Sequence, residues 1–262
     1  MMSFSLQFVL VLIGTFMIAL VLTPLVRLFS FKIDAVDYPN ARRINTKPMP
    51  SAGGLSIVIA FSIATLVFIP MLTSTTAPIK SYLSYTLPVV GAGWIIALTG
   101  LIDDVKELSA KKKMIGILLA ASLVWFLTDF RLNDFKIPFG GPLLHFEPWL
   151  SYLLTVIWIV AITNAVNLID GLDGLVSGVS IISLVTMGIV SYFFLPVPNL
   201  FLTMTIFVLV ASIAGFFPFN YHPAILYLGD TGALFIGFMI SVLSLQGLKN
   251  ATAVAVVTPM II

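Results

Sequence analysis

The stretch Asn164-Ala-Val-Asn-Leu-Ile-Asp-Gly-Leu-Asp-Gly-Leu175 separates two long apolar segments of the sequence. It ends the run Pro148–Ile169 and leads into the longer run Leu175–Gly229. Two amides and two carboxylates therefore stand at the end of a predicted membrane helix. Charge at such a place is costly unless it has a partner or a function. The stretch thus indicates a membrane fold with a polar site at one end.

The composition supports a membrane protein. Of the 262 residues, 60% are hydrophobic and 9% are charged, and the mean hydropathy is +1.12. Soluble domains carry about 25% charged residues. The absence of cysteine excludes a disulfide, a thiolate nucleophile and a zinc–sulfur site. A cleaved signal peptide is not expected, because Ser3–Val26 is long enough to cross a bilayer.

Charge-free segments predict an all-α bundle of about nine transmembrane helices, forming one domain over residues 1–262. Pro196-Val-Pro198-Asn199 is the natural turn that divides the longest apolar run. The predicted helices cover 5–28, 53–72, 87–102, 114–129, 149–169, 174–195, 200–218 and 232–248, and a ninth begins near 252 and continues to Ile262.

Basic residues predict the orientation, since cytoplasmic loops are enriched in Lys and Arg. If the first helix ends inside, the loops 27–52, 103–113, 164–173 and 219–231 are cytoplasmic and the N-terminus is outside. These loops hold nine of the thirteen basic residues: Arg27, Lys32, Arg42, Arg43, Lys47, Lys106, Lys111, Lys112 and Lys113. They also hold eight of the eleven acids: Asp34, Asp37, Asp103, Asp104, Glu107, Asp170, Asp173 and Asp230. Acids hardly affect insertion, so their clustering needs another cause.

Asp103 and Asp104 follow directly on an apolar span and are candidates for a divalent-cation or phosphate site. Adjacent carboxylates repel each other unless a cation lies between them. Lys113 follows Asp103 within ten residues, so it could bind phosphate at the same site. The alternative is an acidic helix end in cytoplasmic water, with the neighbouring lysines anchoring the loop.

The opening stretch offers a second candidate site. Asn164 and Asn167 are three residues apart and share a helical face. Gly171 and Gly174 can end the helix and let backbone amides approach a ligand. An ordinary polar loop between two spans is the alternative.

Two further loops fall on the same side. Asp230 lies in Leu228-Gly-Asp-Thr-Gly-Ala233, either as a site residue or as the N-cap of the next helix. The basic loop before Gly53 could contact anionic headgroups or hold the phosphate of a lipid substrate. Carboxylates gathered with lysine suit Mg²⁺ and a diphosphate.

These residues resemble the motifs of the polyprenyl-phosphate N-acetylhexosamine-1-phosphate transferases. The resemblance rests on Asp103-Asp-Val-Lys-Glu-Leu-Ser-Ala-Lys-Lys-Lys113, Asn164–Leu175, Gly229–Phe238 and Pro48-Met-Pro-Ser-Ala-Gly-Gly54. It runs through essentially the whole chain. Within the family, the sequence is most similar to the branch that starts teichoic acid and other surface polymers. That branch moves GlcNAc-1-phosphate from UDP-GlcNAc to undecaprenyl phosphate and releases UMP.

The resemblance implies a role for each matched residue. Asp103 would be the catalytic aspartate, acting as a base or a nucleophile, with Asp104 as its partner. Lys113 would contact the diphosphate. Asn167 and Asp230 would hold Mg²⁺, for which Mn²⁺ could substitute.

The rest of the motif would serve the nucleoside side. The resemblance places Asp173 near the uracil, whereas Asp170 and Asn164 would have structural or nucleoside-side roles. It also implies a bacterial plasma membrane, a cytoplasmic active site and no nucleic-acid partner, and it leaves a homodimer open.

Two departures from the family pattern stand out. The family usually has a histidine near Asn45, and this sequence does not. The family also continues beyond the position of Ile262 with a loop that helps to select the sugar and with further spans. We therefore expect the chain to lack its C-terminal part.

Three alternatives remain. The sister branch of the family uses UDP-MurNAc-pentapeptide. A proton- or ion-coupled transporter would place its acids near the midplane and show repeated halves. An isoprenoid-diphosphate enzyme would normally need two aspartate-rich clusters, and the glycine-bounded Asp170 and Asp173 are a poor second.

Overall fold

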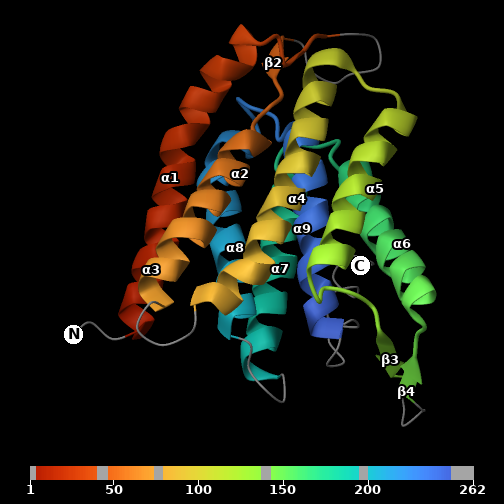
Figure 1. Ribbon diagram of the computed structural model, residues 1–262. Coiled ribbons are helices and arrows are strands. Elements are labelled where there is room, and N and C mark those ends of the chain that lie inside the picture. Colours follow the sequence, from red (N-terminus) through yellow and green to blue (C-terminus); the bar gives the residue numbers. More distant parts are fainter. Residues whose placement is uncertain (1–3, 40–46, 74–78, 137–142, 195–199, 249–262) are drawn as a thin grey trace.

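The computed structural model is a bundle of helices with two short β ribbons, one at each end (Figure 1). It describes residues 4–39, 47–73, 79–136, 143–194 and 200–248. The helices are α1 (Phe4–Lys32), α2 (Gly54–Ile63), the π-helical turn η1 (Ala64–Phe68), α3 (Ile69–Thr73), α4 (Ile79–Lys106), α5 (Ala110–Leu127), α6 (Pro148–Leu168), α7 (Leu175–Phe193), α8 (Leu200–Asn220) and α9 (Gly229–Leu248). The strands are β1 (Val36–Asp37), β2 (Met49–Pro50), β3 (Asp134–Lys136) and β4 (Leu143–His145), which pair as β1–β2 and β3–β4.

The prediction of an all-helical membrane bundle is confirmed. Six helices in the described part of the chain are long and apolar enough to cross a membrane, and the apolar stretch Gly229–Leu245 of α9 is shorter. Helix α5 has suitable length, but three lysines stand in its first turn. The ninth predicted helix, from 252 onward, lies outside the described residues.

Two predicted helix boundaries differ from the structure in a way that matters for the site. Helix α4 was predicted to end at residue 102, but it continues to Lys106, so Asp103 and Asp104 lie in its last turn. It ends where Glu107 takes a left-handed backbone with φ of 46°. Helix α5 begins at Ala110, before the predicted 114. Hydropathy marks the part of a helix that suits lipid, whereas charged residues continue the helix beyond it.

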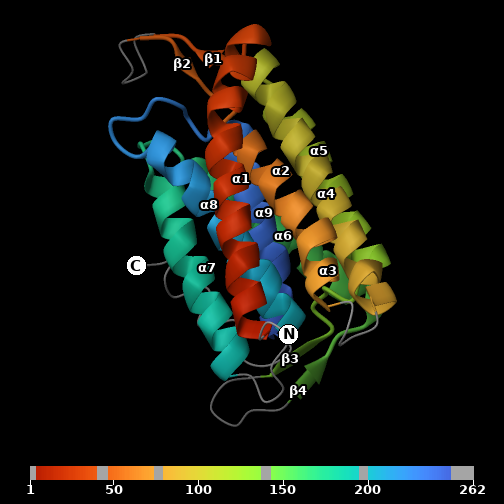
Figure 2. The same cartoon turned by 90° about the vertical axis from the view of Figure 1, so that its left-hand side faces the viewer.

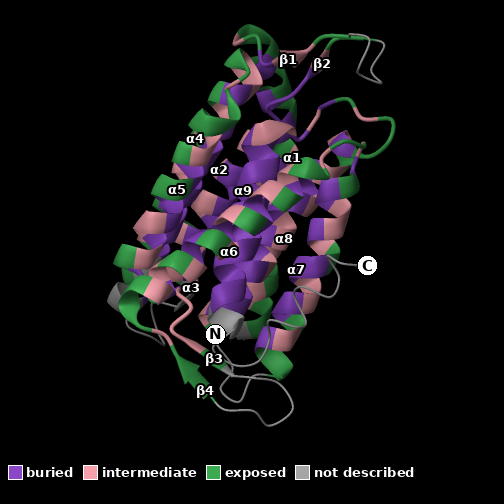
Figure 3. Ribbon diagram, turned by 90° about the vertical axis from the view of Figure 1, so that its right-hand side faces the viewer, coloured by how far each residue is buried: buried purple, intermediate pink, exposed green. Residues whose placement is uncertain are grey.

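Helix α9 occupies the centre of the bundle and packs on α4, α6 and α2 (Figures 1 and 2). Every side chain from Thr231 to Leu245 is buried (Figure 3). Small residues allow this close approach: a Cβ on Gly100 would overlap the backbone of Asp230, and one on Gly54 would overlap Gly232. The start of α9 is thereby fixed against two neighbouring helices.

Candidate active site

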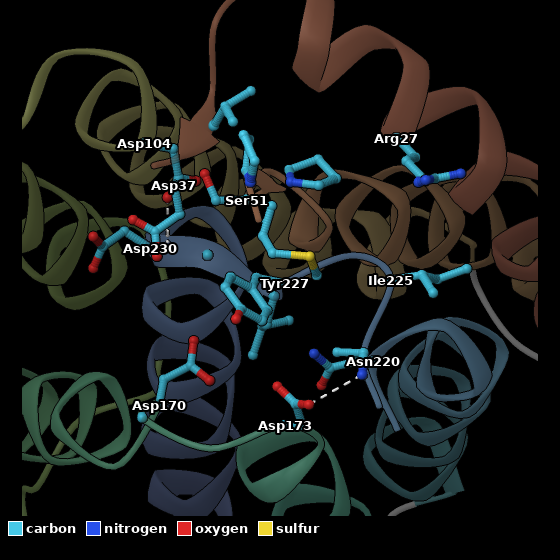
Figure 4. Close-up of a pocket in the computed structure, with 18 of the residues that line it drawn as sticks. Arg27, Asp37, Ser51, Asp104, Asp170, Asp173, Asn220, Ile225, Tyr227 and Asp230 are labelled. Atoms are coloured by element: carbon cyan, nitrogen blue, oxygen red, sulfur yellow. Dashed lines mark hydrogen bonds between the residues drawn. The ribbon is translucent and has the colours of Figure 1, made fainter. Parts of the chain in front are cut away.

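A cavity of about 1350 Å³ lies at the end of the bundle that carries β1 and β2 (Figure 4). The ends of α1, α4, α6, α8 and α9 and the β1–β2 ribbon surround it. Its wall includes these predicted site residues: Asp103, Asp104, Lys113, Asn167, Asp170, Asp173 and Asp230. Residues from segments that are more than one hundred positions apart therefore meet at one hollow.

Lys113 lies between two carboxylates. The turn between α4 and α5 brings the first turn of α5 back against the last turn of α4. Lys113 forms an ion pair with Asp103, whose side chain is 5% exposed, and its Nζ lies 3.3 Å from Asp230 Oδ2. Asp103 also accepts a hydrogen bond from the backbone N–H of Leu108. One cation thus offsets the repulsion between Asp103 and Asp230.

Asp104 caps α9. Its Oδ1 accepts the N–H of Asp230 at 2.9 Å, and its Oδ2 accepts the N–H of Thr231 at 3.0 Å and the Thr231 hydroxyl. The first N–H groups of a helix have no partner within the helix, and a carboxylate there also interacts well with the helix dipole. Asp230 itself lies in the first turn of α9, so Asp104 supplies the cap and leaves the Asp230 side chain to face the cavity.

The two asparagines at the end of α6 have different surroundings. The Asn167 amide donates a hydrogen bond to Asp230 Oδ1. Asn164 instead donates to the Val160 carbonyl at 2.8 Å, one turn back in its own helix. Asn164 is not part of the cavity wall, whereas Asn167 is. A shared helical face was therefore not enough to bring both side chains into the site.

Asp170 lies just past the end of α6, beside the same cluster. Burial and the nearby negative charge of Asp230 raise the pKa of Asp170 to about 7. Both causes disfavour the charged form of a carboxyl group. A cation in the cavity would therefore stabilise the charged form of Asp170.

Asp173 belongs to a second part of the cavity, together with Asn220 and Tyr227, which the sequence analysis did not single out (Figure 4). Asp173 Oδ2 accepts the N–H of Ala224 at 3.0 Å and lies 2.9 Å from His222 Nδ1. The Ser177 hydroxyl donates a hydrogen bond to Asn220 Oδ1 at 2.8 Å, and the Asn220 amide donates one to the Leu226 carbonyl at 3.3 Å. The run Asn220-Tyr-His222 at the end of an apolar segment was the available signal.

The loop before α2 is bonded to the segment that leads into α9. Pro50 accepts the N–H of Tyr227 at 2.9 Å, and the N–H groups of Gly53 and Gly54 donate to the carbonyls of Tyr227 and Leu228 at 3.0 and 2.8 Å. Gly229 has φ of +71°, and a Cβ there would overlap the Ser51 carbonyl. These bonds fix the backbone next to Asp230. Arg42, Arg43 and Asn45 of the same basic loop lie outside the described residues.

The donor set of the cavity fits Mg²⁺. No group of three or more His, Cys, Asp or Glu side chains forms a metal cage within the part of the chain that the structure describes. Mg²⁺ usually takes one or two protein carboxylates and completes its shell with water and substrate phosphate oxygens. Asp230 and the amide oxygen of Asn167, on the wall of a wide cavity, are donors of this kind.

Comparison with known proteins gives a family. Residues 86–248 match the model of "Glycosyl transferase family 4". The chain is 40% identical over 98% of its length to the probable undecaprenyl-phosphate N-acetylglucosaminyl 1-phosphate transferase of Bacillus subtilis. It is 32% identical over 84% of its length to the decaprenyl-phosphate N-acetylglucosaminephosphotransferase of Mycolicibacterium smegmatis. It is 33% identical over 91% of its length to the phospho-N-acetylmuramoyl-pentapeptide-transferase of Staphylococcus saprophyticus.

The chain spans 68%, 55% and 74% of the length of these three relatives, respectively. The family model matches more than half of the chain. Three of the four motifs lie within the matched residues, and only Pro48–Gly54 lies outside them. The chain therefore belongs to glycosyl transferase family 4, as the resemblance implied.

Proposed function

We propose that the protein transfers GlcNAc-1-phosphate from UDP-GlcNAc to undecaprenyl phosphate, giving undecaprenyl-diphospho-GlcNAc and UMP. The observation that carries this proposal is the convergence of Asp103, Lys113, Asn167 and Asp230 on one cavity. The name of the Bacillus subtilis relative supplies the lipid acceptor and the transferred group, and the family resemblance supplies UDP as the nucleotide of the donor. The product would start a cell-wall polymer such as teichoic acid.

The arrangement suits direct attack by the lipid phosphate. An oxygen of the lipid phosphate would form a bond to the phosphorus that carries the sugar, and the bond from that phosphorus to the UMP oxygen would break. Lys113 would bind the diphosphate, and Asp103 would hold Lys113 and accept a proton from the lipid phosphate. Asp173 would lie near the uracil, and Asp170 would have a structural or nucleoside-side role.

Asn167 and Asp230 would hold Mg²⁺, or Mn²⁺ in its place. The bound ion would offset the repulsion between the two anionic substrates and stabilise the charge of the transferred group. Asp104 would act through the position of Asp230, because its hydrogen bonds fix the first turn of α9. Asn164 would have a structural role within α6.

We propose that the cavity faces the cytoplasm and the N-terminus lies outside, with about nine predicted helices crossing the bacterial plasma membrane. Lys106, Lys111 and Lys112 are exposed at the cavity end, as the positive-inside rule expects of a cytoplasmic face. A cytoplasmic cavity would also meet UDP-sugar on the side where nucleotides are found.

The test is UMP release from the full-length protein in micelles that contain undecaprenyl phosphate. UDP-GlcNAc should release UMP in the presence of Mg²⁺ and not after chelation by EDTA. UDP-MurNAc-pentapeptide, the donor used by the sister branch, should release none. Turnover of the pentapeptide donor alone would move the protein to that branch. Coupled uptake into vesicles without UMP release would favour a transporter and overturn the proposal.

A further inference from the structure

The β3–β4 hairpin, at the end of the bundle opposite the cavity, has one apolar face, whereas its other face carries a charged pair beside Leu143. Phe135 and Leu144 are directly paired across the two strands, so they share one face. Asp134 and His145 form the next pair and point to the other face, with Asp134 Oδ1 2.6 Å from His145 Nδ1. Phe135 and Leu144 are 44% and 41% exposed, so the part of the chain that the structure describes leaves this apolar face uncovered.

The base of the hairpin is attached firmly to α5 and α6. Thr155 of α6 accepts the N–H of Leu132 at 3.0 Å, and Ser151 donates to Asn133 Oδ1 at 2.9 Å. The guanidinium of Arg131 lies 5.1 Å from the ring of Trp125 on α5. The apolar face is therefore held in a fixed orientation relative to α5 and to α6, and α6 is long and apolar enough to cross a membrane.

The hairpin projects past the ends of α5 and α6 and reaches about the level where α7 ends (Figures 1 and 2). Large exposed aromatic side chains gather at this end of the helices: Phe126, Trp149, Tyr192 and Phe193. Aromatic residues are enriched where a membrane protein passes from hydrocarbon to headgroups. The hairpin is thus continuous with the lipid-facing surface of the bundle at the depth of an aromatic belt.

We propose that the β3–β4 hairpin lies in the headgroup layer of the leaflet opposite the cavity, with Phe135 and Leu144 turned toward the acyl chains. The depth follows from the backbone. A two-stranded ribbon has unpaired N–H and C=O groups along its edges, which the hydrocarbon core does not tolerate but headgroups and interfacial water can satisfy. The Asp134–His145 pair on the other face would remain in water.

None of these 262 residues is cysteine, so an introduced cysteine has no competitor for the label among them, and any cysteine elsewhere in the full-length protein would first be replaced by serine. Single Cys variants at Phe135, Leu144 and Leu143 would each carry a nitroxide label, and the full-length protein would be reconstituted in phosphatidylethanolamine–phosphatidylglycerol vesicles. Leu143 is the matched control, because it is the same residue type as its neighbour Leu144, is 51% exposed and points to the opposite face. Labels at Ile182 on α7 and at Lys111 give the lipid and water references.

Labels at Phe135 and Leu144 should be several-fold more accessible to oxygen, relative to a water-soluble nickel complex, than the label at Leu143. Equal nickel accessibility at Leu143 and Leu144 would overturn the proposal. Exclusion of both reagents at Phe135 and Leu144 would also overturn it, because a protein partner would then cover the face. Circular dichroism and a single chromatographic peak would show that each variant is folded.

Discussion

The two ends of the bundle carry similar charged pairs but use them differently. At the cavity end, Lys113 of α5 bridges Asp103 of α4 and Asp230 of α9. At the opposite end, Asp129 pairs with Arg131 two residues away, and the Asp129 side chain is 81% exposed. Exposed local pairs contribute about 0–1 kcal/mol. Convergence of distant segments on a hollow, and not the presence of charge, therefore distinguishes the proposed site.

The strongest way to break this comparison is to neutralise one member of the bridged group. Asp103→Asn or Asp230→Asn should lower Mg²⁺-dependent UMP release by about 100- to 1000-fold, because the loss of one group that stabilises charge in an active site has effects of that size. Membrane insertion and expression should stay normal, as judged by the amount of protein in the membrane fraction. Near-normal turnover in both variants would refute the proposed site.

The two asparagines of α6 give a sharper contrast within one helix. Asn167→Ala should lower UMP release by about 10- to 100-fold and raise the Mg²⁺ concentration needed for half-maximal rate, because it removes a proposed metal ligand. Asn164→Ala should change the rate by less than about threefold, because it loses only a hydrogen bond to its own helix. The Mg²⁺ dependence of the initial rate measures both. An equal loss in the two variants would mean that position on the helix, not contact with Asp230, sets the effect.

The cap on α9 should have a smaller effect. Thr231→Val removes the hydroxyl that Asp104 accepts while keeping the shape of the side chain. Loss of one such bond costs about 1 kcal/mol, so UMP release should fall by about fivefold. Thr231→Ser is the control, since it keeps the hydroxyl. A full rate in the Val variant would show that the backbone N–H bonds to Asp104 position Asp230 without help from the side chain.

The smallest effect is expected at the opposite end. Asp134→Asn removes an exposed pair with His145 and should change UMP release by less than about twofold. The thermal unfolding temperature of the same variant should change by no more than about 2 °C, because surface substitutions usually have small effects on stability. Complete loss of activity would contradict our assignment of the catalytic end.

The sequence predicted the helices well because hydrophobic length is a local property. All eight predicted helices in the described part of the chain have counterparts, although the second is interrupted by a π-helical turn at Ala64–Phe68. It also indicated that the acids gather at one end, because Lys and Arg mark the loops of one face.

The different contacts of Asp103 and Asp104 could not be predicted in this way. The contacts differ because α4, which carries both residues, continues past residue 102. The N–H groups at the start of α9 then lie next to Asp104. The bonds from Gly53 and Gly54 to Tyr227 and Leu228 likewise join segments more than 170 residues apart. No local pattern encodes such contacts, because they arise only when the helices pack.

The central place of α9 has a consequence for biogenesis. A ribosome releases the chain from its N-terminus, so the surrounding helices enter the membrane before the helix that they enclose. Asp104 and the glycines of α2 and α4 that contact α9 therefore reach the membrane before α9 does. Helix α9 can pack against α2, α4 and α6 only after its own residues have been synthesised, so Lys113 and Asn167 meet Asp230 after the helices that carry them are already in the membrane.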